Sequence, residues 1–170
     1  MTEQPVTEER IQIAEDFGLK NVNYAAVACR TAGLPFYAAC ALLEKESHGR
    51  NIWGHDNETG VPGQNVTALN FVQAYYRILN GAPSNGVGPC QITWAGSLKN
   101  GHRDGGFFQQ MLEQNLAPWN PGDNMLFGFK KLAEYKAKGT WASAGMSYNG
   151  SQLYGNDLAE KVAAWHQRLR

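Results

Sequence analysis

Apolar residues recur at helical spacing along most of this 170-residue chain, and this periodicity limits the fold more than any other feature of the sequence. The helical pattern covers the segments 7–18, 21–33, 35–49, 67–80, 107–116, 124–139, 141–148 and 158–169. Gly, Pro and Asn interrupt it between residues 49 and 66, again before Gln91, and in a loop predicted over residues 149–155. The sequence therefore predicts a mainly α fold, with an irregular segment or a short β-hairpin after the helix that ends near Gly49.

The chain has the length of one domain and can bury a substantial core. Residues 1–6 have the composition of a tail and precede the first helix, so we assign residues 1–20 to an N-terminal tail and first helix. We assign residues 21–170 to the main domain. Because no linker or repeat separates these segments, we expect a single domain overall.

The charges of the chain balance, with fifteen Lys and Arg against fifteen Asp and Glu. No general field therefore attracts nucleic acid or an acidic membrane surface, and we expect neither as a partner. The N-terminal sequence MTEQPVTEER has no basic region followed by an apolar run, and no segment approaches the roughly eighteen apolar residues of a membrane span. We expect a protein made in the cytoplasm without a signal peptide and not inserted into a membrane.

The helix predicted from Pro35 to Gly49 ends with a carboxyl group on its apolar side. At about 100° per residue, Glu46 falls close to the apolar stripe, whereas Lys45 points nearly opposite. A buried carboxylate loses water, which raises its pKa toward the range in which a carboxylic acid donates a proton at neutral pH. This is the profile of a glycosidase general acid. The alternative is that Glu46 turns to solvent or pairs with Arg50.

Four short motifs follow one another along the chain. They are Glu46-Ser47, then Gly88-Pro89-Cys90-Gln91-Ile92, then Asn120-Pro121 with Asn124 and Gly128, then Tyr148-Asn149-Gly150 followed by Tyr154 and Val162. This order resembles the signature of the soluble lytic transglycosylases and goose-type lysozymes. Over residues 22–168, the run NIWGHD and the closing Trp-His look still more like the muramidase-type domains of endolysins from phages of actinobacteria. Pro89-Cys90 stands where the family has Leu-Met.

The resemblance implies a lysozyme-like fold for residues 21–170 and a peptidoglycan-degrading activity. It implies a muramidase that cleaves the β-1,4 bond between MurNAc and GlcNAc, with Glu46 protonating the glycosidic oxygen. Tyr148 matches the family tyrosine whose hydroxyl steadies the acid. An endolysin of this kind is made in the cytoplasm of the bacterial host and acts on the cell wall after release. We expect a monomer whose partner is the peptidoglycan glycan strand.

Four further residues are assigned to the substrate cleft, three of them by matching positions of the family. Gln91 and Asn149 match residues that hydrogen-bond acetamido sugars, and an amide side chain offers both the donor and the acceptor that such a group needs. Ser47 matches the neighbour of the acid that supports the substrate, and Thr93 is assigned to the same cleft. Tyr148 as a core residue and Asn149 as a helix-ending turn residue remain the alternatives.

The number of carboxylates at the site separates two reactions. A hydrolase usually has a second carboxylate, as nucleophile or as base, whereas a lytic transglycosylase needs none because the sugar completes the reaction and leaves a 1,6-anhydro product. Asp56 is our candidate for the second carboxylate, with Glu58 and Asp104 as weaker ones. Asp56 also suits an Asx turn, so hydrolysis is favoured only slightly.

A zinc amidase, a cysteine peptidase and a non-catalytic module are the alternatives to the glycosidase. The histidines lack the His-x-x-x-His spacing of a zinc amidase, so we expect no metal and no cofactor. Cys90 could serve as a peptidase nucleophile, but Cys29, Cys40 and Cys90 read as buried, reduced thiols. A non-catalytic glycan-binding or phage structural module is the third reading, because a fold does not by itself imply a function.

Overall fold

A computed structural model describes residues 5–57 and 59–170, and these residues form a mainly helical protein. The helices are α1 (Glu8–Asp16), α2 (Val22–Ala32), α3 (Phe36–Glu46), α4 (Ala68–Leu79), α5 (Gly106–Glu113), α6 (Pro121–Lys136), α7 (Trp141–Asn149) and α8 (Gln152–Arg168). The predicted mainly α class is confirmed. Across the described ranges, no helix is both long and apolar enough to cross a membrane.

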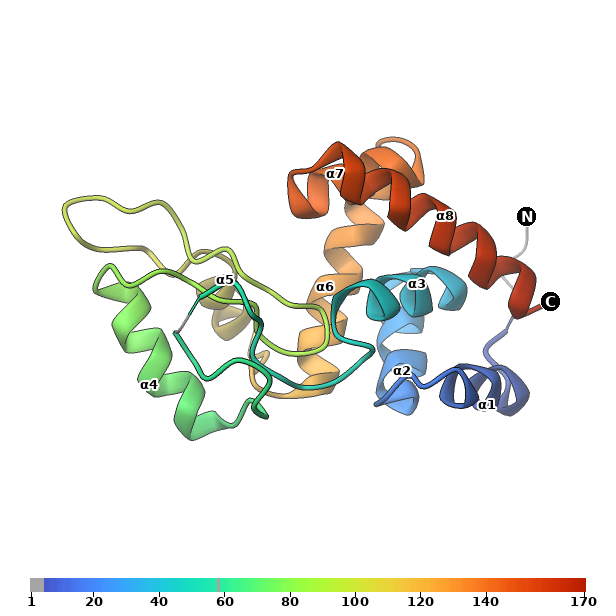
Figure 1. Cartoon of the computed structure of the whole chain (residues 1–170), viewed down its shortest axis with the longest axis horizontal. Helices are drawn as coiled ribbons and strands as arrows, with labels where there is room; N and C mark the ends of the chain where they lie inside the picture. The colour runs from blue at the N-terminus through green and yellow to red at the C-terminus, as the bar shows by residue number, and fades with distance from the viewer. Residues whose placement is uncertain (1–4, 58) are drawn as a thin grey trace.

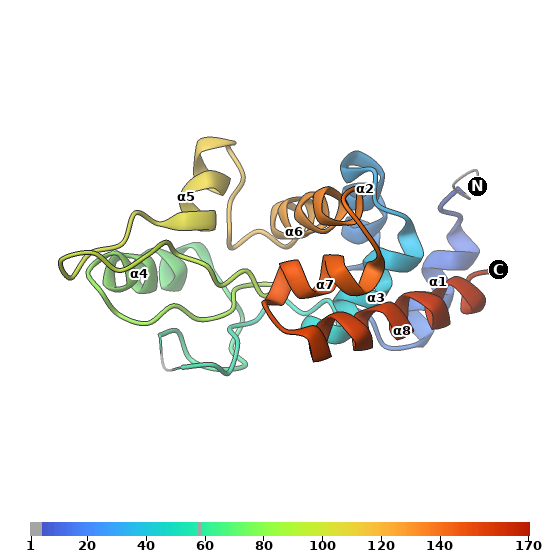
Figure 2. The same cartoon turned by 90° about the horizontal axis from the view of Figure 1, so that it is seen from above.

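The molecule has two parts, which lie side by side along its long axis (Figures 1 and 2). We call α1, α2, α3, α6, α7 and α8 the helical part. The loop part comprises α4, α5 and the irregular segments 50–57, 59–67 and 80–105. The chain passes from one part to the other directly after α3, so the C-terminal end of α3 lies where the two parts meet.

Helix α3 is the centre of the helical part. It packs between α2 and α8, and its residues 38–43 are all buried. Pro35 precedes it, and the helix stops at Glu46 because His48 and Gly49 both have positive φ, 56° and 75°. This end is fixed from outside, since the Asn21 side chain donates a hydrogen bond to the Gly49 carbonyl at 2.8 Å. The last turn of α3 therefore has a defined position.

The loop part is organised around aromatic side chains. The Phe71 ring of α4 lies 6.4 Å from the Trp53 ring, 5.5 Å from the Phe108 ring and 5.5 Å from the Trp119 ring, measured between centroids. Between α3 and α5, the β-structure within the described residues is limited to isolated bridges such as Ile52 with Asn65. The segment after α3 is irregular, as predicted, and it contains isolated bridges in place of a short β-hairpin.

Helix α8 begins earlier than the sequence predicts. Residues 149–155 read as a loop because of their Gly and Asn content, yet α8 starts at Gln152 with Ser151 as its N-cap. Gly155 is buried in the first turns of α8, where an added Cβ would lie 2.1 Å from the Ala142 carbonyl oxygen of α7. This glycine permits close packing of α7 on α8 and does not mark a turn.

Candidate active site

Glu46 is the last residue of α3, and its carboxyl group is partly buried where the two parts meet. The Tyr154 hydroxyl of α8 donates a hydrogen bond to Glu46 Oε1. Burial raises the pKa of Glu46 from 4.5 to about 7, against the Tyr154 hydrogen bond and the Lys45 charge, which both lower it, and with a further rise from Asp56. Arg50 does not pair with Glu46, because its Nε donates to the Ser47 carbonyl at 3.0 Å.

The tyrosine that contacts the acid is Tyr154 and not Tyr148. The Tyr148 hydroxyl donates to the Cys90 carbonyl at 2.9 Å, which differs from the contact implied by the family resemblance. It reaches this carbonyl across Gly128, where an added Cβ would lie 2.6 Å from Cys90 Cβ and 3.1 Å from the Tyr148 hydroxyl oxygen. Tyr148 still lies near Glu46, whose charge contributes to the raised pKa of its phenol.

Asn124 holds the loop that follows Gly88. Its side chain is fully buried, accepts a hydrogen bond from Cys90 N at 2.9 Å and donates to the Val87 carbonyl at 2.9 Å. Gly88 has a φ of 74°, and an added Cβ would lie 2.7 Å from the Asn124 amide. Ser47 ties this loop to α3, since the residue is 2% exposed and its hydroxyl donates to the Pro89 carbonyl at 2.8 Å.

The three other predicted cleft residues differ in how free their side chains are. The Gln91 amide donates to the Ile52 carbonyl at 3.1 Å and to the Gly88 carbonyl at 2.8 Å, so only its oxygen remains to accept from a ligand. The Thr93 hydroxyl donates to the Gln91 carbonyl at 2.9 Å. Asn149 ends α7 and is exposed. These contacts show Gln91 and Thr93 organising the loop, while Asn149 is open to solvent.

Asp56 is exposed, and its backbone is held by a buried amide side chain. Asn85 Oδ1 accepts from Asp56 N at 3.3 Å, and Asn85 Nδ2 donates to the Gly54 carbonyl at 2.9 Å and the Asn57 carbonyl at 3.0 Å. Of the weaker carboxylate candidates, Asp104 accepts from Gly106 N at 3.0 Å before α5, and Glu58 lies outside the described residues.

Two other chemistries find little support in the described residues. No group of three or more His, Cys, Asp or Glu side chains there could hold a metal ion. Cys90 is fully buried, and burial raises the pKa of its thiol well above the ordinary value, which disfavours the thiolate that a nucleophile needs. Cys29, Cys40 and Cys90 form no disulfide and are buried, as predicted.

The sequence prediction missed three partners of this site. Tyr154 and Asp157 lay in or beside the segment predicted as a loop, so their shared face on α8 was not recognised. The sequence did contain a signal for this face, because residues at helical spacing follow one another at Tyr154, Asp157, Lys161 and Trp165. Nothing in the local sequence distinguishes the buried Asn85 from an ordinary loop asparagine.

No protein-family model, curated protein or solved structure matches this chain. The reaction that this protein could catalyse is therefore inferred from the residues around Glu46. A carboxyl whose pKa lies near neutrality is protonated in a substantial fraction of molecules at pH 7 and can still release its proton. The arrangement around Glu46 is suited to general acid catalysis.

Proposed function

We propose that this protein is a peptidoglycan-degrading glycosidase with a lysozyme-like fold, in which Glu46 is the general acid. The observation that carries the proposal is the partly buried Glu46 carboxyl, whose pKa is raised to about 7. The ordered motifs of the sequence supply the substrate class, a MurNAc–GlcNAc strand. In this scheme the strand lies across the end of α3, between the helical part and the loop part.

The protonated Glu46 donates its proton to the glycosidic oxygen while the bond to the sugar's anomeric carbon breaks. The Tyr154 hydrogen bond fixes the carboxyl rotamer and also stabilises the carboxylate that remains after proton transfer. Asp56 is the candidate second carboxylate, and its influence on Glu46 is electrostatic. In a muramidase it would stabilise the developing positive charge or activate a water molecule.

Lytic transglycosylation is the second candidate, favoured by the state of Asp56. Its side chain is exposed, and within the described part of the chain no hydrogen bond fixes its carboxylate; the bond that is present involves its backbone N–H. A catalytic base needs a fixed position, whereas a transglycosylase needs only the acid. Mass spectrometry of the released sugars separates the reactions, since hydrolysis gives a reducing MurNAc end and transglycosylation a 1,6-anhydro end.

The test of the general acid is Glu46→Gln, which removes the proton donor with little change of shape. We expect peptidoglycan clearing to fall by at least about a hundredfold, the usual scale of general acid catalysis. Glu160→Gln is the matched control, because Glu160 is an exposed acid on α8, and it should retain full activity. Unchanged clearing by Glu46→Gln would contradict the proposal. A wild-type protein that binds the wall but does not clear it would favour a non-catalytic module.

A further inference from the structure

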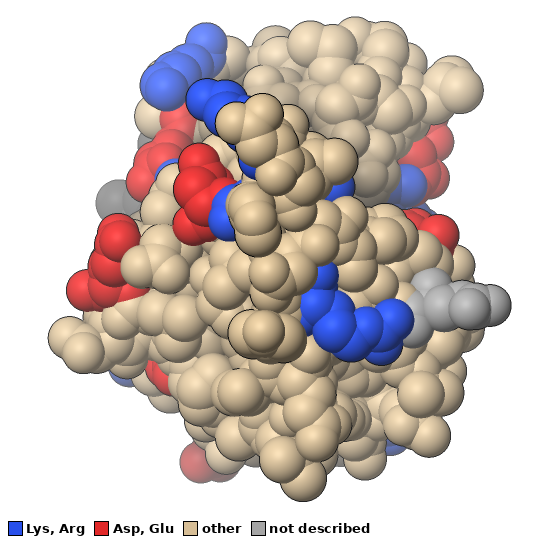
Figure 3. Space-filling model, turned by 90° about the vertical axis from the view of Figure 1, so that its left-hand side faces the viewer, with Lys and Arg blue, Asp and Glu red and all other residues tan. Residues whose placement is uncertain are grey.

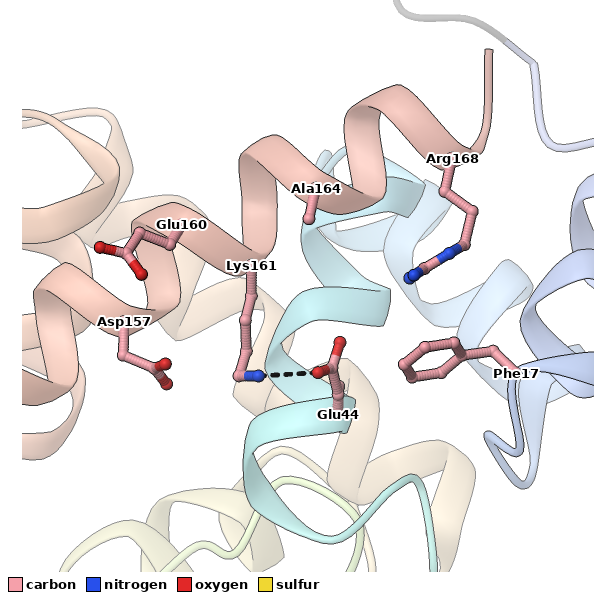
Figure 4. A pocket seen from close by; sticks show the side chains of 7 residues that line it. All are labelled: Phe17, Glu44, Asp157, Glu160, Lys161, Ala164 and Arg168. Carbon is pink, nitrogen blue, oxygen red and sulfur yellow. Dashed lines mark hydrogen bonds and ion pairs between the residues drawn. The ribbon is translucent and has the colours of Figure 1, made fainter.

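Three successive side chains at the end of α3 each meet a residue of α8. Glu46 accepts from Tyr154, Lys45 pairs with Asp157, and Glu44 accepts from Lys161 Nζ at 2.7 Å and from Trp165 Nε1 at 2.7 Å. Figure 4 shows the Glu44–Lys161 contact joining the two helices across a pocket that Asp157 also lines. The acid is therefore the last member of a row of polar contacts between α3 and α8.

Lys45 has two partners in this row. Its ammonium group pairs with the Asp157 carboxylate and lies 4.3 Å from the centroid of the Tyr154 ring. The Lys45 side chain is only 16% exposed, against 45% for Asp157. A cation over an aromatic face is attracted to it, so Lys45 and the Tyr154 ring hold each other in place. The phenol that donates to Glu46 is thus supported by a neighbouring ion pair.

The positive charge of Lys45 also opposes the protonated form of Glu46. Its charge already lowers the pKa of Glu46, and an ammonium that paired directly with a carboxylate would lower it further. A carboxylate so paired would have lost its proton at pH 7. Among the described residues, Lys45 forms its ion pair with Asp157 and none with Glu46, so the Asp157 carboxylate competes with Glu46 for this ammonium group.

We propose that Asp157 is a positioning residue, which holds Lys45 over the Tyr154 ring and away from the Glu46 carboxyl. This inference rests on the proposed role of Glu46 as the acid. The charged or titratable groups of the row and its surroundings lie on α3, α7, α8 and the segments that follow α3 and Gly88. They are Glu44, Lys45, Asp56, Cys90, Tyr148, Tyr154, Asp157, Glu160 and Lys161, of which Glu160 acts on Lys161 and not on Glu46.

The test is the titration of Glu46 by carboxyl-carbon NMR in the full chain, without substrate. In Asp157→Asn, Lys45 keeps its charge but loses its carboxylate partner, and we expect the Glu46 midpoint to fall by about one pH unit. In Lys45→Met the positive charge is gone, and we expect the midpoint to rise. Because the two charges have opposite signs, opposite shifts alone do not decide the question, and the double variant Lys45→Met/Asp157→Asn does: if Asp157 acts through Lys45, Asp157→Asn lowers the Glu46 midpoint in the wild-type background and leaves it unchanged in the Lys45→Met background.

Glu160→Gln is the matched control, since it removes one negative charge from the same helix and Glu160 is not paired with Lys45. In this variant the titration midpoint of Glu46 should stay at the wild-type value. An unchanged or raised midpoint in Asp157→Asn, or an equal fall in Glu160→Gln, would overturn the inference. Because the Asp157 side chain is 45% exposed and asparagine has nearly the same shape, Asp157→Asn should remain folded.

Activity gives a second readout. A midpoint lowered from about 7 to about 6 reduces the protonated fraction at pH 7 roughly fivefold, so clearing should fall by that factor at pH 7 and little near pH 5. The two proposals can fail separately. If the midpoints shift as expected but Glu46→Gln still clears peptidoglycan, the glycosidase proposal fails and the positioning role of Asp157 toward Glu46 stands. If Glu46→Gln is inactive but the Asp157→Asn midpoint stays unchanged, only the positioning role fails.

Discussion

Opposing influences act on the Glu46 carboxyl, and their balance decides its chemistry. The Tyr154 hydroxyl and the Lys45 ammonium favour the charged form, whereas burial favours the neutral form and is the largest influence. The net result is a pKa of about 7. Each pKa unit corresponds to about 1.4 kcal/mol, so the fold disfavours the Glu46 carboxylate by about 3 kcal/mol relative to the unfolded chain.

This imbalance predicts how stability depends on pH. The pKa of Glu46 is higher in the folded state than in the unfolded state, so its stabilising contribution is complete below about pH 4.5 and is lost as pH rises through about 7. Glu46→Gln cannot take up this charge. We expect the variant and the wild type to have similar unfolding free energies near pH 4, and the variant to be more stable by up to about 3 kcal/mol near pH 8.

Urea unfolding followed by circular dichroism at both pH values measures the difference. A Glu46→Gln variant that is equally or less stable than the wild type near pH 8 would contradict the buried, high-pKa carboxyl. The control is Glu160→Gln, whose exposed side chain should not change the pH dependence in this way.

At the scale of single residues, the sequence could indicate that Glu46 lies close to the apolar side of its helix, but not which side chain contacts it. The position of Glu46 relative to the apolar stripe follows from helical geometry within one segment. The choice of Tyr154 over Tyr148 depends on where α8 begins and how α7 packs on it, which are tertiary properties. A family motif assigns a residue type more securely than it assigns that residue's hydrogen bond.

At the scale of helices, the end of α3 depends on Gly49. Its φ is 75°, and an added Cβ would lie 2.2 Å from the Lys20 carbonyl oxygen, so both the conformation and the available space favour glycine. We expect Gly49→Ala to lower the unfolding free energy by at least about 2 kcal/mol, because a backbone atom cannot move aside as a flexible side chain can.

Gly33→Ala is the control for this prediction. Gly33 also ends a helix with positive φ, 65°, but an added Cβ there has no neighbour within 4 Å, so only the conformational cost of about 1 kcal/mol applies. Denaturant unfolding of both variants gives the comparison. Equal losses would mean that the contact between Gly49 and Lys20 does not constrain the end of α3.

The existence of each described helix was predictable for a physical reason, whereas several helix boundaries were not, the start of α8 above all. Spacing at 3.6 residues is a local property, and it located the segments that form all of the described helices, with α8 detected only from its middle onward. Gly155 was read as a loop signal because glycine favours turns in general. In the structure it serves the contact between α7 and α8, which only the packed molecule reveals.

At the scale of the whole molecule, the balanced charge predicts a weak dependence on salt. The face formed by the loop part shows Lys and Arg in separate places among uncharged atoms, with Asp and Glu also dispersed (Figure 3). With fifteen basic and fifteen acidic residues, attraction to an anionic wall polymer contributes little. We expect clearing of peptidoglycan to change less than about twofold between about 0.05 M and about 0.3 M NaCl.

Turbidity clearing at fixed pH, with the wall substrate washed free of other polymers, measures this dependence. A steep loss of activity with added salt would show that electrostatic attraction, and not shape and hydrogen bonding, brings the glycan to the site.

The contact between the C-terminal end of α1 and the end of α8 determines where a second protein could be fused to this one. The Phe17 ring lies 4.9 Å from the Trp165 ring, and the Arg168 guanidinium lies 4.3 Å from the Phe17 ring. Helix α1 and the C-terminal end of α8 lie at the end of the molecule opposite α4 (Figures 1 and 2). A protein fused after Arg170 would therefore be attached at the end of the molecule away from the loop part. Even a short linker would then leave the region between the two parts open to a long polymer.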